Sequence, residues 1–128
     1  MKEIAIKENH LYNKTFKRGE RFAGRYVAVS VLKDYSAKRL MIANPQKKYV
    51  NRIGLSVPKR EGGAIERNRE KRIIREALRH IEKERPLKKG WLIVISTRPA
   101  IVGVKSTDVE RDLAFVFRKL NMYAEGKK

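Results

Sequence analysis

The sequence contains no cysteine, which excludes disulfide bonds and thiolate metal sites. Groups suited to catalysis are also few: two histidines, His10 and His80, and three aspartates, Asp34, Asp108 and Asp112. The histidines fall on different predicted helices without the spacing of metal ligands, and no pair of acids is placed to hold a two-metal catalytic centre. Serine and threonine nucleophiles lack a candidate base. These residues predict no catalytic group and no metal site in this chain.

Long apolar runs are missing as well. Residues 1–7 contain no hydrophobic segment of the kind found in secretion signals, and no stretch reaches the length needed to span a membrane. We therefore expect a cytoplasmic protein. With 128 residues the chain has the size of one domain, predicted as 1–128 with an ordered core at about 8–122 and a polar tail at 123–128.

Acidic residues are scarce relative to basic ones. The chain has 32 Lys and Arg against 14 Asp and Glu, a formal net charge of +18 and an isoelectric point near 10.5. Such an excess opposes compaction unless a polyanion neutralises it, so the composition predicts a phosphate-rich partner. A membrane-surface protein is the competing interpretation, and it is disfavoured because no long amphipathic helix carries exposed Trp, Phe and Leu.

Apolar periodicity and breaker residues divide the chain into helices and strands. The predicted helices cover residues 8–18, the basic segment that follows a flexible joint at Gly62-Gly63 and ends near Arg85-Pro86, and residues 107 to about 120. The predicted strands cover 26–32, 51–57 and 91–95, with a further candidate at 39–43 inside the long connection 33–50. The last helix begins with Thr107-Asp108-Val109-Glu110, a pattern typical of a capping box.

This order of elements is typical of an α+β fold, a two-layer sandwich with the order α-β-β(-β)-α-β-α and one mixed sheet. The strands 51–57 and 91–95 flank the central helix, so the middle of the chain is predicted to form a β-α-β unit. The strand 91–95 is a nearly continuous apolar run, which predicts burial on both faces. The last helix is predicted to pack through Val109, Leu113, Val116, Phe117 and Leu120.

The segment Arg67 to Arg75 is the most informative motif, with five cations and one amide in nine residues. At about 100° per residue, one arc of the helix carries Arg69, Arg72, Arg75 and Arg79, and the opposite arc carries Ile73, Ile74, Ala77, Leu78 and Ile81. A solvated helix face and a polyanion site both fit, since nearby glutamates could pair with the cations. The excess of cations and the use of Arg, whose planar fork grips phosphate, favour the polyanion site.

The sheet face turned away from the predicted core is a second candidate surface. Alternation places mostly small side chains there: Tyr26, Ala28, Ser30, Arg52, Gly54 and Ser56. Tyr12 and Phe16, one turn apart on the first helix, would rim this trough, with basic side chains nearby (Lys14, Lys17, Arg18 and Arg25). The set suits an extended single-stranded nucleic acid, with stacked bases and neutralised phosphates. Phe16 fits core packing equally well, whereas the hydroxyl of Tyr12 favours exposure.

Several motifs, in this order, resemble one known family. The segment Arg67-Asn68-Arg69-x-Lys71-Arg72-x-x-Arg75-Glu76 is similar to the RNR signature of the bacterial ribonuclease P protein component. The flanking matches are Tyr12-x-x-x-Phe16-Lys17-x-Gly19, Arg25, Arg52-Ile53-Gly54-Leu55-Ser56-Val57-x-Lys59, Arg98-Pro99 and Val109-Glu110-Arg111-Asp112-Leu113. The resemblance covers about residues 11–120.

The resemblance implies a protein subunit of ribonuclease P, the ribonucleoprotein endoribonuclease that removes the 5′ leader from precursor tRNA. The RNA subunit would be the catalyst, using Mg²⁺, and the protein would lower the magnesium requirement. The implied partners are the catalytic RNA, with one protein per RNA, and precursor tRNA. A left-handed β-α-β crossover is also implied, against the usual right-handed rule.

The family's binding residues carry over by matching position, and no catalytic or metal-binding residue is implied. Contacts to the catalytic RNA fall to Arg67, Asn68, Arg69, Lys71, Arg72 and Arg75. Contacts to the single-stranded leader fall to Tyr12, Phe16, Arg25, Tyr26, Ser30, Arg52 and Lys59.

Three residues depart from the family pattern. Glu70 stands where an aliphatic residue is usual and falls on the apolar arc, although a place in the first helical turn would let the dipole stabilise it. Gly63 replaces a usual Asn, and Ser30 replaces a frequent aromatic. A ribosomal-type structural RNA-binding protein is the alternative function, disfavoured because no long basic tail is present. A nuclease acting without RNA is disfavoured by the missing acid cluster.

Overall fold

The computed structural model describes residues 4–5, 9–34, 51–57, 63–88 and 90–123. The candidate strand at 39–43 and Lys59 lie outside the described residues. Within the described part of the chain, no helix is long and apolar enough to cross a membrane.

The predicted helices, and the strands predicted at 26–32, 51–57 and 91–95, are confirmed with small shifts at their ends. The elements are β1 (Ile4–Ala5), α1 (Asn9–Arg18), β2 (Glu20–Ala23), β3 (Val27–Lys33), β4 (Arg52–Ser56), α3 (Gly63–Glu84), β5 (Trp91–Thr97), the 3-10 helix η1 (Pro99–Ile101) and α4 (Ser106–Lys119). The strands β1 and β2 are additional. With two and four residues, they are too short to show an alternating pattern in the sequence.

All five strands form one mixed sheet in the order β1-β4-β5-β3-β2. The central strand β5 runs parallel to β4 and antiparallel to β3. β1 pairs in parallel with β4, and β2 pairs antiparallel with β3. Because α3 connects the parallel neighbours β4 and β5, the predicted β-α-β unit is confirmed. The left hand of its crossover stays a prediction.

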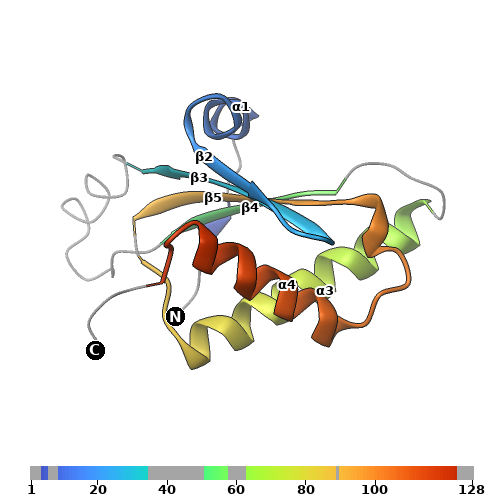
Figure 1. The fold of residues 1–128 in the computed structure, drawn as a ribbon. Helices are drawn as coiled ribbons and strands as arrows, with labels where there is room; N and C mark the ends of the chain where they lie inside the picture. The colour runs from blue at the N-terminus through green and yellow to red at the C-terminus, as the bar shows by residue number, and fades with distance from the viewer. Residues whose placement is uncertain (1–3, 6–8, 35–50, 58–62, 89, 124–128) are drawn as a thin grey trace.

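Helices cover both faces of the sheet. Figure 1 shows α1 on one face and α3 beside α4 on the other. The main core lies on the α3 and α4 side and includes Val27, Val29, Val31, Ile93 and Ile95 from the strands and Ile74, Ile81, Leu113 and Phe117 from the helices. A smaller core of Leu92 and Val94 lies on the α1 side. The α+β class, the mixed sheet and the burial of β5 on both faces are therefore confirmed.

The capping box predicted at the start of the last helix is wrong. The N-cap of α4 is Lys105, which makes no side-chain capping hydrogen bond, so the predicted capping box at 107–110 does not form. Glu110 instead faces α3, where its Oε1 lies 3.0 Å from Nδ1 of His80. The predicted inner side of α4 is confirmed. Val109, Leu113, Val116 and Phe117 are fully buried, and Leu120 is half-buried.

Tyr123, assigned to the polar tail, belongs to the core. Its ring contacts Phe117 edge to face, with centroids 6.5 Å apart, and the guanidinium of Arg85 lies 4.5 Å from its centroid on the outer side. Burial raises the pKa of the Tyr123 phenol, and the charge of Arg85 opposes that rise in part. The ordered core thus extends one residue beyond the predicted boundary.

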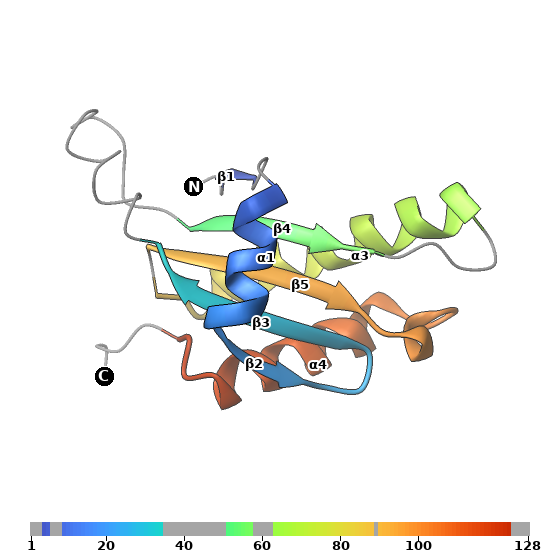
Figure 2. The ribbon, with the colours of Figure 1, turned by 90° about the horizontal axis from the view of Figure 1, so that it is seen from above.

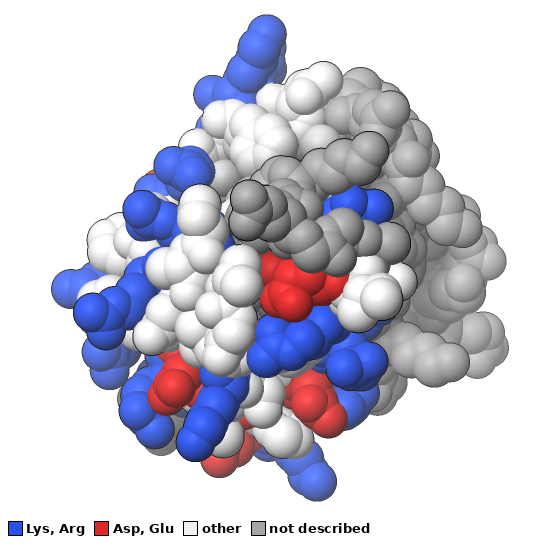
Figure 3. Space-filling model, turned by 90° about the vertical axis from the view of Figure 1, so that its right-hand side faces the viewer, with Lys and Arg blue, Asp and Glu red and all other residues white. Residues whose placement is uncertain are grey.

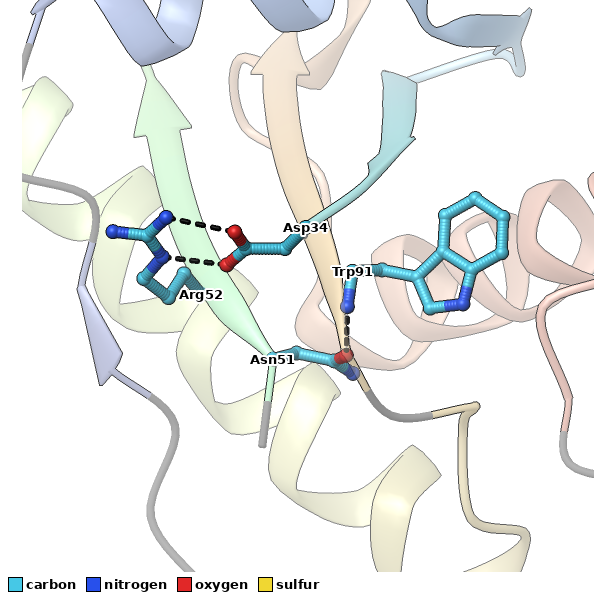
Figure 4. A network of polar contacts seen from close by, with 4 residues as sticks. All are labelled: Asp34, Asn51, Arg52 and Trp91. Atoms are coloured by element: carbon cyan, nitrogen blue, oxygen red, sulfur yellow. Dashed lines mark hydrogen bonds and ion pairs between the residues drawn. The ribbon is translucent and has the colours of Figure 1, made fainter. Parts of the chain in front are cut away.

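Polar contacts join the ends of three strands (Figure 4). Arg52 donates two hydrogen bonds to Asp34, from Nε at 2.6 Å and from Nη2 at 2.8 Å. Asn51 accepts from the backbone N–H of Trp91 and donates to the carbonyl of Lys88, both at 2.9 Å. The Asp34 side chain is only 2% exposed, so its charge depends on these internal partners rather than on water.

Replacing Asp34 by Ala is predicted to destabilise the fold by about 3–5 kcal/mol, because the Arg52 guanidinium, with a side chain only 13% exposed, would lose both hydrogen bonds to this carboxylate. The double variant Asp34→Leu with Arg52→Met should lose distinctly less, since it removes both charges. Urea unfolding of the three proteins measures this. A single variant as stable as the double variant would contradict the assignment.

Candidate nucleic-acid interface

The outer side of α3 presents an open basic stripe. Asn68, Arg72, Arg75 and Arg79 are exposed along this helix of 22 residues. The opposite side is buried against the sheet and α4. The folded helix therefore separates its apolar and cationic sides as predicted. Figure 3 faces the end of the molecule where α3 begins, and basic side chains predominate over that end.

Arg69 is the exception within the predicted basic arc. It is half-buried, and its Nη2 donates to the carbonyl of Val104, in the segment before α4, at 3.0 Å. Its Nη1 lies 3.3 Å from Glu66. Arg69 thus links α3 to the segment that leads into α4, and part of its hydrogen-bonding capacity is used inside the protein.

The remaining residues of the motif lie at the border of the buried side. Arg67 and Lys71 are half-buried, and Nη1 of Arg67 is buried without a hydrogen-bond partner among the described residues. Glu70 is 1% exposed, which confirms its place on the apolar arc, and it has an interaction partner in the structure. It does not lie in the first turn, because α3 already begins at Gly63. The predicted stabilisation by the helix terminus is therefore wrong.

The sheet face under α1 is organised by strand register (Figure 2). One row across β4, β5 and β3 consists of Gly54, Val94 and Ser30, and the next consists of Ser56, Ser96 and Ala28. The Tyr12 ring packs on Gly54 so closely that a Cβ there would lie 2.6 Å from it. Only a glycine at this position lets α1 approach the sheet in this way.

Two predictions about this face are wrong. Ser30 is 2% exposed, so it lies in the packed layer of the face covered by α1 and lines no open trough. Tyr12 is half-buried against the small core of Leu92 and Val94, where exposure was expected. The physical reason is that small residues on the sheet allow the helix to sit directly on them, which closes the trough they would otherwise form.

Two further predicted leader contacts have partners inside the protein. The fork of Arg52 grips Asp34, and its side chain is 13% exposed. Tyr26 precedes β3, and its ring packs against the main core rather than on the α1 side. The alternation argument fails for Tyr26, because the regular strand begins only at Val27. It holds for Arg52, which pairs with Leu92 on the α1 side of the sheet, but the Arg52 fork is occupied by Asp34.

Phe16 and Arg25 remain accessible. Phe16 is 42% exposed on α1, which decides between core packing and exposure in favour of exposure. Arg25 is exposed in the turn between β2 and β3. Ser96 is a half-exposed residue of the same face that the sequence pattern did not single out. The polar residues after an apolar run would have been the only signal for it.

Among the described residues, no three His, Asp or Glu side chains come together in a way that could hold a metal ion. The accessible groups on the described surface include guanidinium groups and the aromatic rings of Phe16 and Phe115. This combination can bind phosphates and stack on bases.

The sequence as a whole matches the family model described as Ribonuclease P over residues 1–121. The chain belongs to the ribonuclease P protein family. It is 32% identical over 128 residues to the ribonuclease P protein component of Clostridium acetobutylicum, covering 100% of this chain and 98% of the relative. It is 33% identical over 122 residues to that of Bacillus velezensis, covering 95% and 93%.

Solved structures of ribonuclease P proteins share the fold. The Staphylococcus aureus protein superposes with a TM-score of 0.75 at 22% identity, covering 96% of this chain and 100% of that one. The Thermotoga maritima protein superposes with a TM-score of 0.69 at 22% identity, covering 98% and 100%. The family resemblance inferred from the sequence motifs is confirmed.

Proposed function

We propose that this chain is the protein subunit of a ribonuclease P ribonucleoprotein, the endoribonuclease that removes the 5′ leader from precursor tRNA. Family membership over nearly the whole chain supports the assignment. The structural observation that carries it is the exposed stripe of Arg72, Arg75 and Arg79 on a helix whose other side is fixed in the core. Cationic side chains held on a rigid helix are preorganised for phosphates.

The α3 stripe is proposed to contact the catalytic RNA, one protein to one RNA. Asn68, Arg72 and Arg75 would make direct contacts, and Arg79 would extend the same surface by one turn. Arg67, Arg69 and Lys71, which are half-buried, would contribute from its border. By neutralising phosphates, this surface would lower the repulsion between catalytic RNA and precursor tRNA. Less magnesium would then be needed to bring them together.

The leader is proposed to follow the α1 side of the sheet. Phe16 would stack on a base, and Arg25 would neutralise a phosphate. Tyr12 would support this surface from its packed position on Gly54. Lys59 lies outside the described residues and stays a predicted leader contact.

Hydrolysis is assigned to the RNA subunit, with Mg²⁺ supplying the activation of water when bound to that RNA. The residues of this chain would bind and orient the two RNA molecules. Since the substrate is a newly made transcript, we propose that the protein acts in the cytoplasm.

The low-magnesium cleavage assay tests the function. Precursor tRNA should be cut at its 5′ leader junction by a bacterial ribonuclease P RNA at low Mg²⁺ only when this protein is added. The protein alone should cut nothing. Cleavage by the protein alone would indicate a nuclease, and RNA binding without stimulation would indicate a ribosomal-type structural protein. Either outcome would overturn the proposal.

Neutralising the α3 stripe should change the salt dependence of binding to the catalytic RNA. Arg72→Ala and Arg75→Ala should each weaken affinity and reduce the slope of log K against log salt by about one unit, since each removes one phosphate contact. Arg69→Ala should reduce the slope less, because its guanidinium is partly used by Val104 and Glu66. Arg111→Ala, an exposed arginine on α4, is the matched control. Unchanged slopes in the first two variants would remove α3 from the interface.

Removing the Phe16 ring should weaken binding of leader-bearing tRNA selectively. Phe16→Ala is expected to cost on the order of 1–3 kcal/mol in the holoenzyme's affinity for precursor tRNA if a base stacks on the ring. Its affinity for leaderless tRNA should not change. Fluorescence anisotropy with both tRNAs measures the difference, and an equal loss for both would count against a leader contact.

A further inference from the structure

The turn between β2 and β3 is held to the end of β5 by Arg98. Nη1 of Arg98 donates to the carbonyl of Gly24 at 2.7 Å, and its backbone N–H donates to the carbonyl of Tyr26 at 2.9 Å. These two bonds lie on either side of Arg25 in the sequence. They hold the β2–β3 turn, which carries the exposed Arg25, to the exposed Arg98 that follows β5.

Asp112 of α4 holds the same turn through hydrogen bonds to its backbone. One carboxylate accepts three backbone N–H bonds, from Arg25 at 2.9 Å, Tyr26 at 2.8 Å and Val27 at 3.1 Å. Gly24 packs directly against this carboxylate, since a Cβ at residue 24 would lie 2.6 Å from one carboxylate oxygen of Asp112.

The position of Asp112 affects the charge of the neighbouring arginines. The carboxylate is directed at backbone N–H groups, and within the described part of the chain neither Arg25 nor Arg98 has an ion-pair partner. Arg98 donates from its side chain to a single described acceptor, although a guanidinium carries five N–H donors. Both arginines are therefore equipped to bind an external anion.

Strand register places Arg98 at one end of the α1 face: it follows Thr97, the last residue of β5, and lies two residues after Ser96. Arg25 lies in the adjacent β2–β3 turn, which the two hydrogen bonds of Arg98 hold to this end of the sheet. Ala28 and Ser96 are register partners next to Val27 and Thr97, the pair that ends the β3–β5 ladder. In Figure 2, the β2–β3 turn and the end of β5 extend beyond α1 on the same side. A strand that passes Phe16 along this face would reach the two guanidiniums.

We infer that Arg25 and Arg98 together form a clamp for one backbone phosphate of the RNA leader, and that Asp112 is the positioning residue that holds the clamp in place. The inference rests on the proposed function, because it assumes that a leader lies on this face. It adds Arg98 as a binding residue and gives Asp112 a role that acts only through the turn. Paired guanidiniums suit a phosphodiester because each presents a planar fork of donors.

The direction in which Asp112→Asn changes the affinity for leader-bearing tRNA separates a positioning role from a purely electrostatic one. Asp112→Asn removes a negative charge close to the clamp, so charge alone predicts tighter leader binding. The amide has a single acceptor oxygen and cannot satisfy the same three N–H donors, so displacement of the turn predicts weaker binding. Gly24→Ala is the second test variant, because it keeps every charge and presses a Cβ against Asp112.

The experiment measures affinities of the reconstituted holoenzyme for precursor and leaderless tRNA at several salt concentrations. Arg98→Ala and Arg25→Ala should each weaken the binding of leader-bearing tRNA only, and each should reduce the slope of log K against log salt for that tRNA. In the double variant this slope should fall by about 0.7 unit in total, because both arginines contact the same phosphate. Asp112→Asn and Gly24→Ala should weaken it severalfold, and Asp112→Asn should have no further effect in the Arg25→Ala, Arg98→Ala background. Arg111→Ala, with a side chain 81% exposed on the same helix, is the matched control.

Two results would overturn the inference. One is an unchanged slope of log K against log salt for leader-bearing tRNA in Arg98→Ala. The other is an affinity of Asp112→Asn for leader-bearing tRNA that equals or exceeds that of the wild type. Unchanged affinity for leaderless tRNA shows that each variant is folded and still docks on the catalytic RNA. If the wild-type holoenzyme does not distinguish the two tRNAs, the proposed leader site fails as a whole. That result differs from a failure confined to Arg98 and Asp112.

Discussion

The burial of β5 between helices on both faces is the contact on which the rest of the structure depends. Its inner residues Ile93 and Ile95 meet α3 and α4, while Leu92 and Val94 meet the α1 side. A chain with a formal charge of +18 repels itself when compact, so the apolar contacts around this strand must outweigh that repulsion. The cations are then left on the outer surfaces of the elements that β5 holds together.

The same arrangement explains why the basic groups are directed outward in separate sets. The α3 stripe is exposed on the helix surface opposite the core, and two further exposed arginines lie in the β2–β3 turn and directly after β5. Two RNA molecules could therefore be contacted by two different surfaces. Acids are used mostly as internal partners: Asp34 holds Arg52, and Asp112 holds backbone N–H groups.

Apolar periodicity predicted the helices and strands well, whereas the contacts of individual side chains were predicted less reliably. The apolar arcs of α3 and α4 and the run of β5 follow directly from periodicity, and all are confirmed. The pairing of Arg52 with Asp34 joins residues 18 apart and leaves no periodic trace. The burial of Ser30 depends on how closely α1 approaches, which Gly54 permits and which no local pattern reveals. The backbone partners of Asp112 lie 85 to 87 residues away, so no local pattern predicts them.

Trp91 gives the molecule an optical property of its own. It is the only tryptophan, it starts β5 beside the Asn51 contact, and its half-buried ring packs against the main core. The strand rises about 3.3 Å per residue, so the indole lies roughly 20 Å from the arginines at the other end of β5. Its emission therefore reports the integrity of the hydrophobic interior separately from changes at the end of the sheet that carries Arg25 and Arg98. The folded state carries an intrinsic fluorophore that is distant from that end.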